Sequence, residues 1–279
     1  MIKNYVQAPL PFEGQKRYFV KEFVKVLQTY DDYVTIIDLF GGSGLLSYIS
    51  KKEKPNARII YNDYDYYTER INNILKTNIL LQDIRKIVSG YERGIQLPKN
   101  VKGEILQRVK QEENTGFVDW ITLSSNLLFS AKYVTSYEQL SKEGIYNKIC
   151  IKNYSAEGYL DGIEIVHDDY QNVYNQFKDI SNVLFLVDPP YLSTDVKTYK
   201  MTWKLADYLN VLTILNDRPF VYFTSNKSSI IELCEWIGEN KISHNPFANA
   251  SKIFINKSLN YNSKYTDIMI CLNQNIVGL

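Results

Sequence analysis

The sequence predicts an α/β fold built on a largely parallel sheet, and three observations lead to that prediction. Short apolar, β-rich segments alternate with segments of helical periodicity. A glycine-rich run, residues 41–44, stands where one of these strands ends and a helix begins. A polar helical stretch, residues 84–160, interrupts the alternation, which then resumes.

In the first half of the chain, the strand at 34–40 is the clearest element. Its unbroken apolar run is typical of a strand that is buried on both faces of a parallel sheet. The elements predicted there, in order, are helix 16–30, strand 34–40, helix 45–53, strand 57–63 and helix 68–88.

The second half repeats this alternation and then closes differently. Residues 251–273 predict two strands around an Asn/Ser/Lys turn, which is a closing antiparallel hairpin. The elements before it are strand 161–169, helix 170–180, strand 182–191, helix 203–215, strand 218–226 and helix 228–239.

The interruption suggests an inserted subdomain. We expect residues 1–83 and 161–279 to form one domain and residues 84–160 to be inserted into it. The insert holds 11 basic and 8 acidic residues, hence +3, and the remainder of the chain is then −2. That sign suits contact with phosphate, although charge alone slightly favours a solvated helical lobe.

Composition excludes several classes of protein. With 32 basic and 31 acidic residues, bulk charge cannot explain nucleic-acid binding, and 45% hydrophobic residues exclude a disordered chain. Three cysteines without CxxC spacing and two histidines predict neither a disulfide framework nor a metal site. No signal peptide or membrane span is recognisable, so we expect a cytoplasmic protein that has no membrane partner.

The glycine-rich run favours a nucleoside-containing ligand. Asp38 precedes it at the end of the strand, and Asp63 ends the next strand, where a carboxylate can accept hydrogen bonds from ribose hydroxyls. Ser47 occupies the third glycine position of a dinucleotide motif, and no Gly-Lys-Ser/Thr is present for a phosphate loop. S-adenosylmethionine requires neither a third glycine nor a phosphate loop, so it remains a candidate ligand. The alternative is an ordinary strand-to-helix turn that binds no ligand.

A second run, residues 188–191, ends the strand 182–191 with Asp-Pro-Pro-Tyr. Two prolines stop the strand and fix the backbone, which leaves the Pro189 carbonyl and the Asp188 carboxylate as rigid acceptors beside the Tyr191 ring. Two acceptors and one aromatic face suit an exocyclic amino group on a planar base. Acceptors that lie out of the ring plane would free the nitrogen lone pair for attack on an electrophile.

These motifs, in this order, resemble the amino-group DNA adenine methyltransferases of the Dam-like type. The matching segments are PFEGQK (11–16), DLFGGSG (38–44), YND (61–63), HDDY (167–170) and DPPY (188–191). The resemblance implies a Rossmann-like methyltransferase sheet with a C-terminal antiparallel hairpin and an inserted, mostly helical target-recognition subdomain. It also implies S-adenosylmethionine as cofactor, double-stranded DNA as substrate, base flipping and no metal. A cognate restriction endonuclease is left open as a second partner.

The resemblance assigns site residues by motif. The implied cofactor-binding residues are Phe12, Gly14, Lys16, Asp38, Phe40, Gly41, Gly42, Ser43, Gly44, Asp63, Asp169 and Tyr170. The implied catalytic residues are Asp188, Pro189, Pro190 and Tyr191. Glu13 and Gln15 depart from the small residues common in the opening motif, so Lys16 could equally be a solvated cation at a helix start.

Other functions and residues stay open at this stage. RNA adenine or the amino group of cytosine would keep the chemistry, whereas a non-catalytic DNA-binding or cofactor-sensing relative and a nicotinamide-dependent oxidoreductase would not. His167 is expected to be satisfied or exposed rather than catalytic. In the insert, the aromatic residues Trp120, Tyr133 and Tyr137 are expected to form its own small core, and Asn126, Ser130 and Lys132 are candidates for reading bases or phosphates.

Overall fold

A computed structural model describes residues 4–32, 34–129, 132–192, 203–216, 218–260 and 263–273. The chain divides into two compact units. The helical unit comprises Met1–Gly14 and Tyr66–Tyr159, and the sheet unit comprises Gln15–Asp65 and Leu160–Leu279.

The boundary predicted between residues 83 and 84 falls inside helix α4 (Ile74–Ile87). The structure divides the chain at 65/66 instead, because Leu80, Leu81 and Ile84 of α4 are buried in the core of the helical unit. The second boundary, at 159/160, is one residue from the predicted one.

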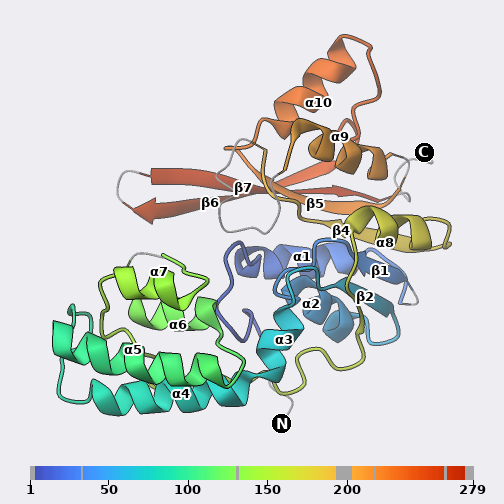
Figure 1. Cartoon of the computed structure of the whole chain (residues 1–279). Coiled ribbons are helices and arrows are strands. Elements are labelled where there is room, and N and C mark those ends of the chain that lie inside the picture. The colour runs from blue at the N-terminus through green and yellow to red at the C-terminus, as the bar shows by residue number, and fades with distance from the viewer. Residues whose placement is uncertain are drawn as a thin grey trace. The chain divides into compact units, whose positions relative to one another are not determined.

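The sheet unit is built on seven strands in the order β3, β2, β1, β4, β5, β7, β6 (Figure 1). Their bounds are β1 Thr35–Asp38, β2 Arg58–Asn62, β3 Glu164–Val166, β4 Val183–Val187, β5 Phe220–Ser225, β6 Ser251–Asn260 and β7 Ser263–Leu272. Strands β1 to β5 pair in parallel, and β7 is antiparallel to both β5 and β6. This confirms the predicted fold class, a Rossmann-like methyltransferase sheet with an antiparallel closing hairpin.

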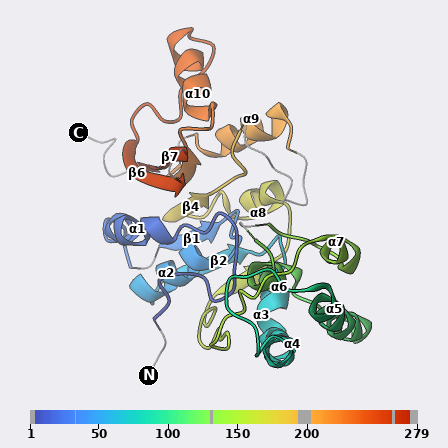
Figure 2. The same cartoon turned by 90° about the vertical axis from the view of Figure 1, so that its left-hand side faces the viewer.

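Helices cover both faces of this sheet (Figure 2). The helices are a short 3-10 turn η1 Arg17–Phe19, α1 Val20–Leu27, α2 Leu45–Glu53, α8 Tyr170–Phe177, α9 Leu205–Ile214 and α10 Ile230–Glu239. Side chains alternate across the strands. Ile37 and Phe185 join the core that α8, α9 and α10 cover, whereas Phe223 points the other way and meets Phe19 at 5.4 Å between ring centroids.

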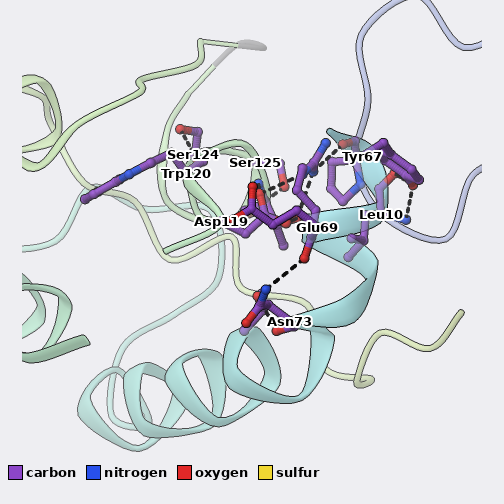
Figure 3. Close-up of polar contacts among 12 residues, drawn as sticks. Leu10, Tyr67, Glu69, Asn73, Asp119, Trp120, Ser124 and Ser125 are labelled. Atoms are coloured by element: carbon purple, nitrogen blue, oxygen red, sulfur yellow. Dashed lines mark hydrogen bonds and ion pairs between the residues drawn. The ribbon is translucent and has the colours of Figure 1, made fainter. Parts of the chain in front are cut away.

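The helical unit contains α3 Tyr67–Asn72, α4, α5 Lys99–Asn114, α6 Trp120–Leu127 and α7 Tyr137–Lys142 around its own aliphatic core. The amino-terminal segment is bonded to α3 (Figure 3). The Tyr67 hydroxyl lies 3.0 Å from the Leu10 nitrogen and 3.1 Å from its carbonyl oxygen. Arg70 donates to the Pro11 carbonyl at 2.8 Å and pairs with the buried Asp119 at 3.0 Å. Among the helices described in both units, none is long and apolar enough to cross a membrane.

Candidate active site

The glycine-rich turn after β1 needs its glycines for two different reasons. Gly42 and Gly44 have φ values of 51° and 70°, in the left-handed region that favours glycine, and Gly44 immediately precedes α2. A Cβ on Gly41 would lie 2.1 Å from the Tyr61 ring. The sequence suggested that these glycines let a ligand approach, but at Gly41 the group that approaches is a tyrosine of the neighbouring strand.

Asp38 ends β1 as a buried carboxylate, and the backbone amide of Phe40 lies close enough to lower its pKa. Ser47 of α2 donates to Oδ2 at 2.7 Å, while Oδ1 has no hydrogen-bond partner in the described part of the chain. Burial raises the pKa of Asp38 to about 7, against the lowering effect of the Ser47 bond. The charge of Asp188 adds to the rise in pKa, and that of Lys16 opposes it. A buried acceptor without a donor is rare in native proteins, so Oδ1 is suited to a donor from a ligand.

Asp188 lies beside Asp38 because the strands that carry them are neighbours. Asp38 is in register with Leu186 of β4, and the Leu39 amide donates to the Leu186 carbonyl at 3.1 Å. The carboxyl ends of β1 and β4 therefore meet at one edge of the sheet, which is where open α/β sheets bind ligands.

Lys16 completes this group of charges. Its ammonium forms an ion pair with Oδ2 of Asp188 and lies 5.5 Å from the ring centroid of Tyr191 and 5.8 Å from that of Phe223. The Lys16 side chain is only 7% exposed, so its reading as a solvated cation is wrong. Pro189 is buried and Tyr191 is half-buried, so the Asp-Pro-Pro-Tyr run lines this edge.

Asp63 is tied to the glycine-rich turn through Tyr61, a residue of the YND segment to which the sequence assigned no role of its own. The Tyr61 hydroxyl lies 2.8 Å from the Gly42 carbonyl oxygen and 3.0 Å from Oδ1 of Asp63, whose side chain is fully buried. His167 is exposed and places Nδ1 2.9 Å from the Asp63 carbonyl oxygen, as expected of a satisfied histidine.

Asn62 fixes the loop after β3 against the end of β1. Its side-chain nitrogen donates to the carbonyls of Leu39 at 3.1 Å and Asp168 at 2.9 Å, and its oxygen accepts from the Asp168 amide at 3.1 Å. Asp169 then caps α8 by accepting from the Gln171 amide at 2.8 Å. The predicted role of Asp169 at a cofactor adenine stays a prediction.

An aromatic cluster lies on the same sheet unit. Tyr170 packs 4.9 Å from Phe40 and is stacked with Trp203 at 5.8 Å, and Trp203 lies 5.0 Å from Tyr208. Trp203 and Tyr208 were missed because no motif marks them. These four rings pack on one another and against the core of the sheet unit.

Two predicted cofactor residues belong to the helical unit. Phe12 packs 5.6 Å from Tyr67, and Gly14 has a φ of 80°. Their role toward a cofactor stays a prediction.

The helical unit corrects one candidate for base recognition. Asn126 is buried, accepts from the Cys150 amide at 2.7 Å and donates to the Thr122 carbonyl at 2.7 Å, so it is a structural residue. Trp120 and Tyr137 pack against the core, as expected, and Tyr133 is half-buried. Lys132 is exposed and paired with Glu143, and Ser130 lies outside the described residues.

Comparison with known proteins gives the family. No family model matches the chain. A solved structure, precorrin-6y C5,15-methyltransferase from Geobacter metallireducens GS-15, has a TM-score of 0.39 at 9% identity over 98% of this chain and 100% of that one, a likeness too low to support any inference. A Haemophilus influenzae protein named "Putative methyltransferase" is 38% identical over 277 residues, which are 96% of this chain and 93% of that protein. At that identity over nearly the whole length, the chain belongs to the same methyltransferase family.

Proposed function

We propose that this methyltransferase transfers a methyl group from S-adenosylmethionine to the exocyclic amino group of adenine in double-stranded DNA. The observation that carries the proposal is the meeting of Asp38 and Asp188 at adjacent strand ends, with Lys16 between their charges. Asp38 provides the acidic group that the methyl donor requires. Asp188 belongs to the Asp-Pro-Pro-Tyr run, which suits a planar amine.

The residues of this edge fit the cofactor. The unpartnered Oδ1 of Asp38 would accept a hydrogen bond from the cofactor's ammonium group, and the aromatic cluster and Asp63 are candidates for its adenosine. With Asp38 and Asp188 ionised, their two negative charges and the one positive charge of Lys16 leave a net −1, which favours a cationic ligand. When bound, S-adenosylmethionine supplies an electrophilic methyl group on a positively charged sulfur.

The chain's own part in the reaction is to hold the amine. Asp188 and the Pro189 carbonyl would accept its two N–H groups, and Tyr191 would stack on the ring. Lys16 acts through Asp188, because the ion pair fixes the direction of the carboxylate. Acceptors that are rigid before the substrate arrives stabilise the charge that develops on nitrogen at no cost in reorganisation.

DNA as the substrate requires one more step. The adenine amine lies inside the base stack, so the base must be extruded into the site at a cost of a few kcal/mol. The proline pair gives the extruded base a rigid edge to meet, since each proline has a fixed φ.

The test is methylation of mixed-sequence DNA, followed by sequencing that detects methylated bases. We expect N6-methyladenine in a defined sequence context. Asp188→Ala should abolish turnover and retain the stabilisation of the protein by S-adenosylmethionine, and His167→Gln is the matched control that should keep both. Methylation confined to RNA or to cytosine would replace the substrate, and stabilisation by NAD alone would refute the proposal.

A further inference from the structure

A second group of residues lies at the sheet edge that holds Asp38 and Asp188. Strand β7 runs antiparallel to β5, so its first residues lie where β5 ends: Asp267 is in register with Ser225, the last residue of β5. Tyr265 is two residues further out on β7 and is half-buried. The closing hairpin therefore extends the ligand-binding edge of the sheet.

Asn226 fastens the loop after β5 to this part of β7. Its amide donates to the Thr266 carbonyl at 2.9 Å, and its side-chain oxygen accepts from the Thr266 amide at 2.9 Å. The next residue, Lys227, is exposed and places its ammonium 5.0 Å from the ring centroid of Tyr265. Lys227 therefore lies in a turn that Asn226 ties to β7, and its ammonium faces an aromatic ring of that strand.

Arg17 and Tyr18 supply the other half of the group, just before α1. Both are exposed, and Arg17 Nη2 donates to the Tyr18 hydroxyl at 2.8 Å. The pKa of Tyr265 is raised by burial, by the buried Asp267 and by Tyr18, and is lowered by Lys16. The segment that carries Arg17 and Tyr18 packs on β5, because Phe19 meets Phe223 at 5.4 Å between ring centroids and the Lys16 ammonium lies 5.8 Å from the same ring. Lys16 is also the residue that pairs with Asp188.

We infer that Arg17, Tyr18, Lys227 and Tyr265, here named the edge patch, bind backbone phosphates of the DNA strand that carries the target base. The inference rests on the proposed function. Arginine, lysine and tyrosine side chains are among the usual donors to phosphate oxygens, and such contacts set the register of a protein on DNA. The acidic neighbour of Tyr265, Asp267, is buried, whereas the two cations of the patch, Arg17 and Lys227, are exposed.

The position of the edge patch favours a polymer over a small methyl acceptor. A molecule held only by Asp188 and Tyr191 would not need the cations Arg17 and Lys227, of which Lys227 follows the neighbouring strand β5. A nucleotide in that site has phosphates on both sides, and these must lie on protein surface next to the site. The edge patch would thus hold the extruded nucleotide by its backbone while Asp188 holds its base.

The test measures binding of a fluorescein-labelled mixed-sequence duplex by anisotropy over a series of NaCl concentrations, with saturating S-adenosylhomocysteine. Each phosphate contact contributes about 0.9 to the slope of log K against log salt. Lys227→Gln should reduce the magnitude of the slope by about 1 and weaken binding about eightfold at 0.1 M salt. Arg17→Gln should do the same, and the double variant should lose about twice as much slope.

Lys52→Gln is the matched control, because Lys52 is a half-exposed lysine near the end of α2, at the opposite edge of the sheet. Unchanged thermal midpoints would show that the variants are folded. Variants with the slope of Lys52→Gln, in a protein that binds DNA, would overturn the edge patch and leave the proposed function standing. A wild-type protein that does not bind DNA would overturn both the edge patch and the DNA substrate. Reduced slopes without methylation of any DNA would support the edge patch and refute the proposed reaction.

Discussion

Asp38→Asn should raise the stability of the cofactor-free protein and abolish its stabilisation by cofactor. The reason is that the buried native carboxylate lowers the free energy of unfolding when no cofactor is bound. Burial raises the pKa of Asp38 from 3.8 to about 7. The unfolded chain therefore loses this proton at a lower pH than the folded one, and the free energy of unfolding falls as the pH rises from about 4 to about 7. A rise in pKa of that size corresponds to at most about 4 kcal/mol, and asparagine removes the loss.

This gain in stability is partly offset by a hydrogen-bond donor that the asparagine buries without an acceptor. The asparagine oxygen can keep the Ser47 hydrogen bond, but its NH₂ then occupies the buried position of Oδ1 without an acceptor, at a cost of about 1–3 kcal/mol. We expect the variant without cofactor to be about 1–3 kcal/mol more stable than wild type at pH 8. The difference should vanish near pH 5, where the wild-type loss is about 2 kcal/mol and so matches the cost of the buried NH₂.

Thermal unfolding at pH 5 and pH 8, with and without S-adenosylmethionine, measures both effects. One kcal/mol shifts the midpoint by about 2–4 °C in a chain of this size, and the stabilisation by cofactor should be lost in the variant. Ser50→Ala is the control, since it removes another buried oxygen without a hydrogen-bond partner and should stabilise equally at both pH values. A variant less stable than wild type at pH 8, or one that keeps the cofactor effect, would refute the reasoning.

Three further substitutions test the contacts around the site and in the helical unit. Gly41→Ala should displace the Tyr61 ring and lower the midpoint by several degrees, and adding Tyr61→Ala should cost less than the two single changes summed, as a double-mutant cycle would measure. Asn126→Ala should cost about 2–3 kcal/mol in urea unfolding, because it leaves the buried Cys150 amide without its acceptor; equal stability would mean that water replaces the side chain. Arg70→Met should cost about 3–5 kcal/mol in urea unfolding at pH 7, since Asp119 would keep a buried charge without its cation; an unchanged stability would mean that the hydrogen bonds from Thr122 are enough to hold that charge.

The strands, and the glycine-rich and Asp-Pro-Pro-Tyr motifs at their ends, could be predicted from the sequence, because each depends on the pattern of a few consecutive residues. Apolar runs followed by Gly41 or Pro189 mark strand ends, and parallel strands bring their ends to one edge. The sequence did not predict the roles of Tyr61, Asn62 and Trp203. Each role depends on which loop the side chain contacts, and those contacts are set by the pairing of strands that are distant in sequence. The two polar residues just before Asp63, in a strand that is otherwise apolar, could have indicated that this strand end makes specific contacts.

The boundary of the helical unit escaped prediction for a related reason. Periodicity shows that α4 has an apolar face but not which core receives it. Leu80, Leu81 and Ile84 fit either domain by pattern, and the structure buries them with α5 and α6.

The order of strands also governs how the protein can fold during synthesis. β1 is central, yet its neighbour β4 begins at Val183, so the ribosome adds more than a hundred residues before that pair can form. Tyr66–Tyr159 is complete earlier and consists mainly of helices with local contacts, which form fast. The nascent chain therefore carries a finished helical lobe while β1 still lacks β4 and β2 still lacks β3, and a stall in translation before β4 would leave the open edge of β1 exposed to aggregation.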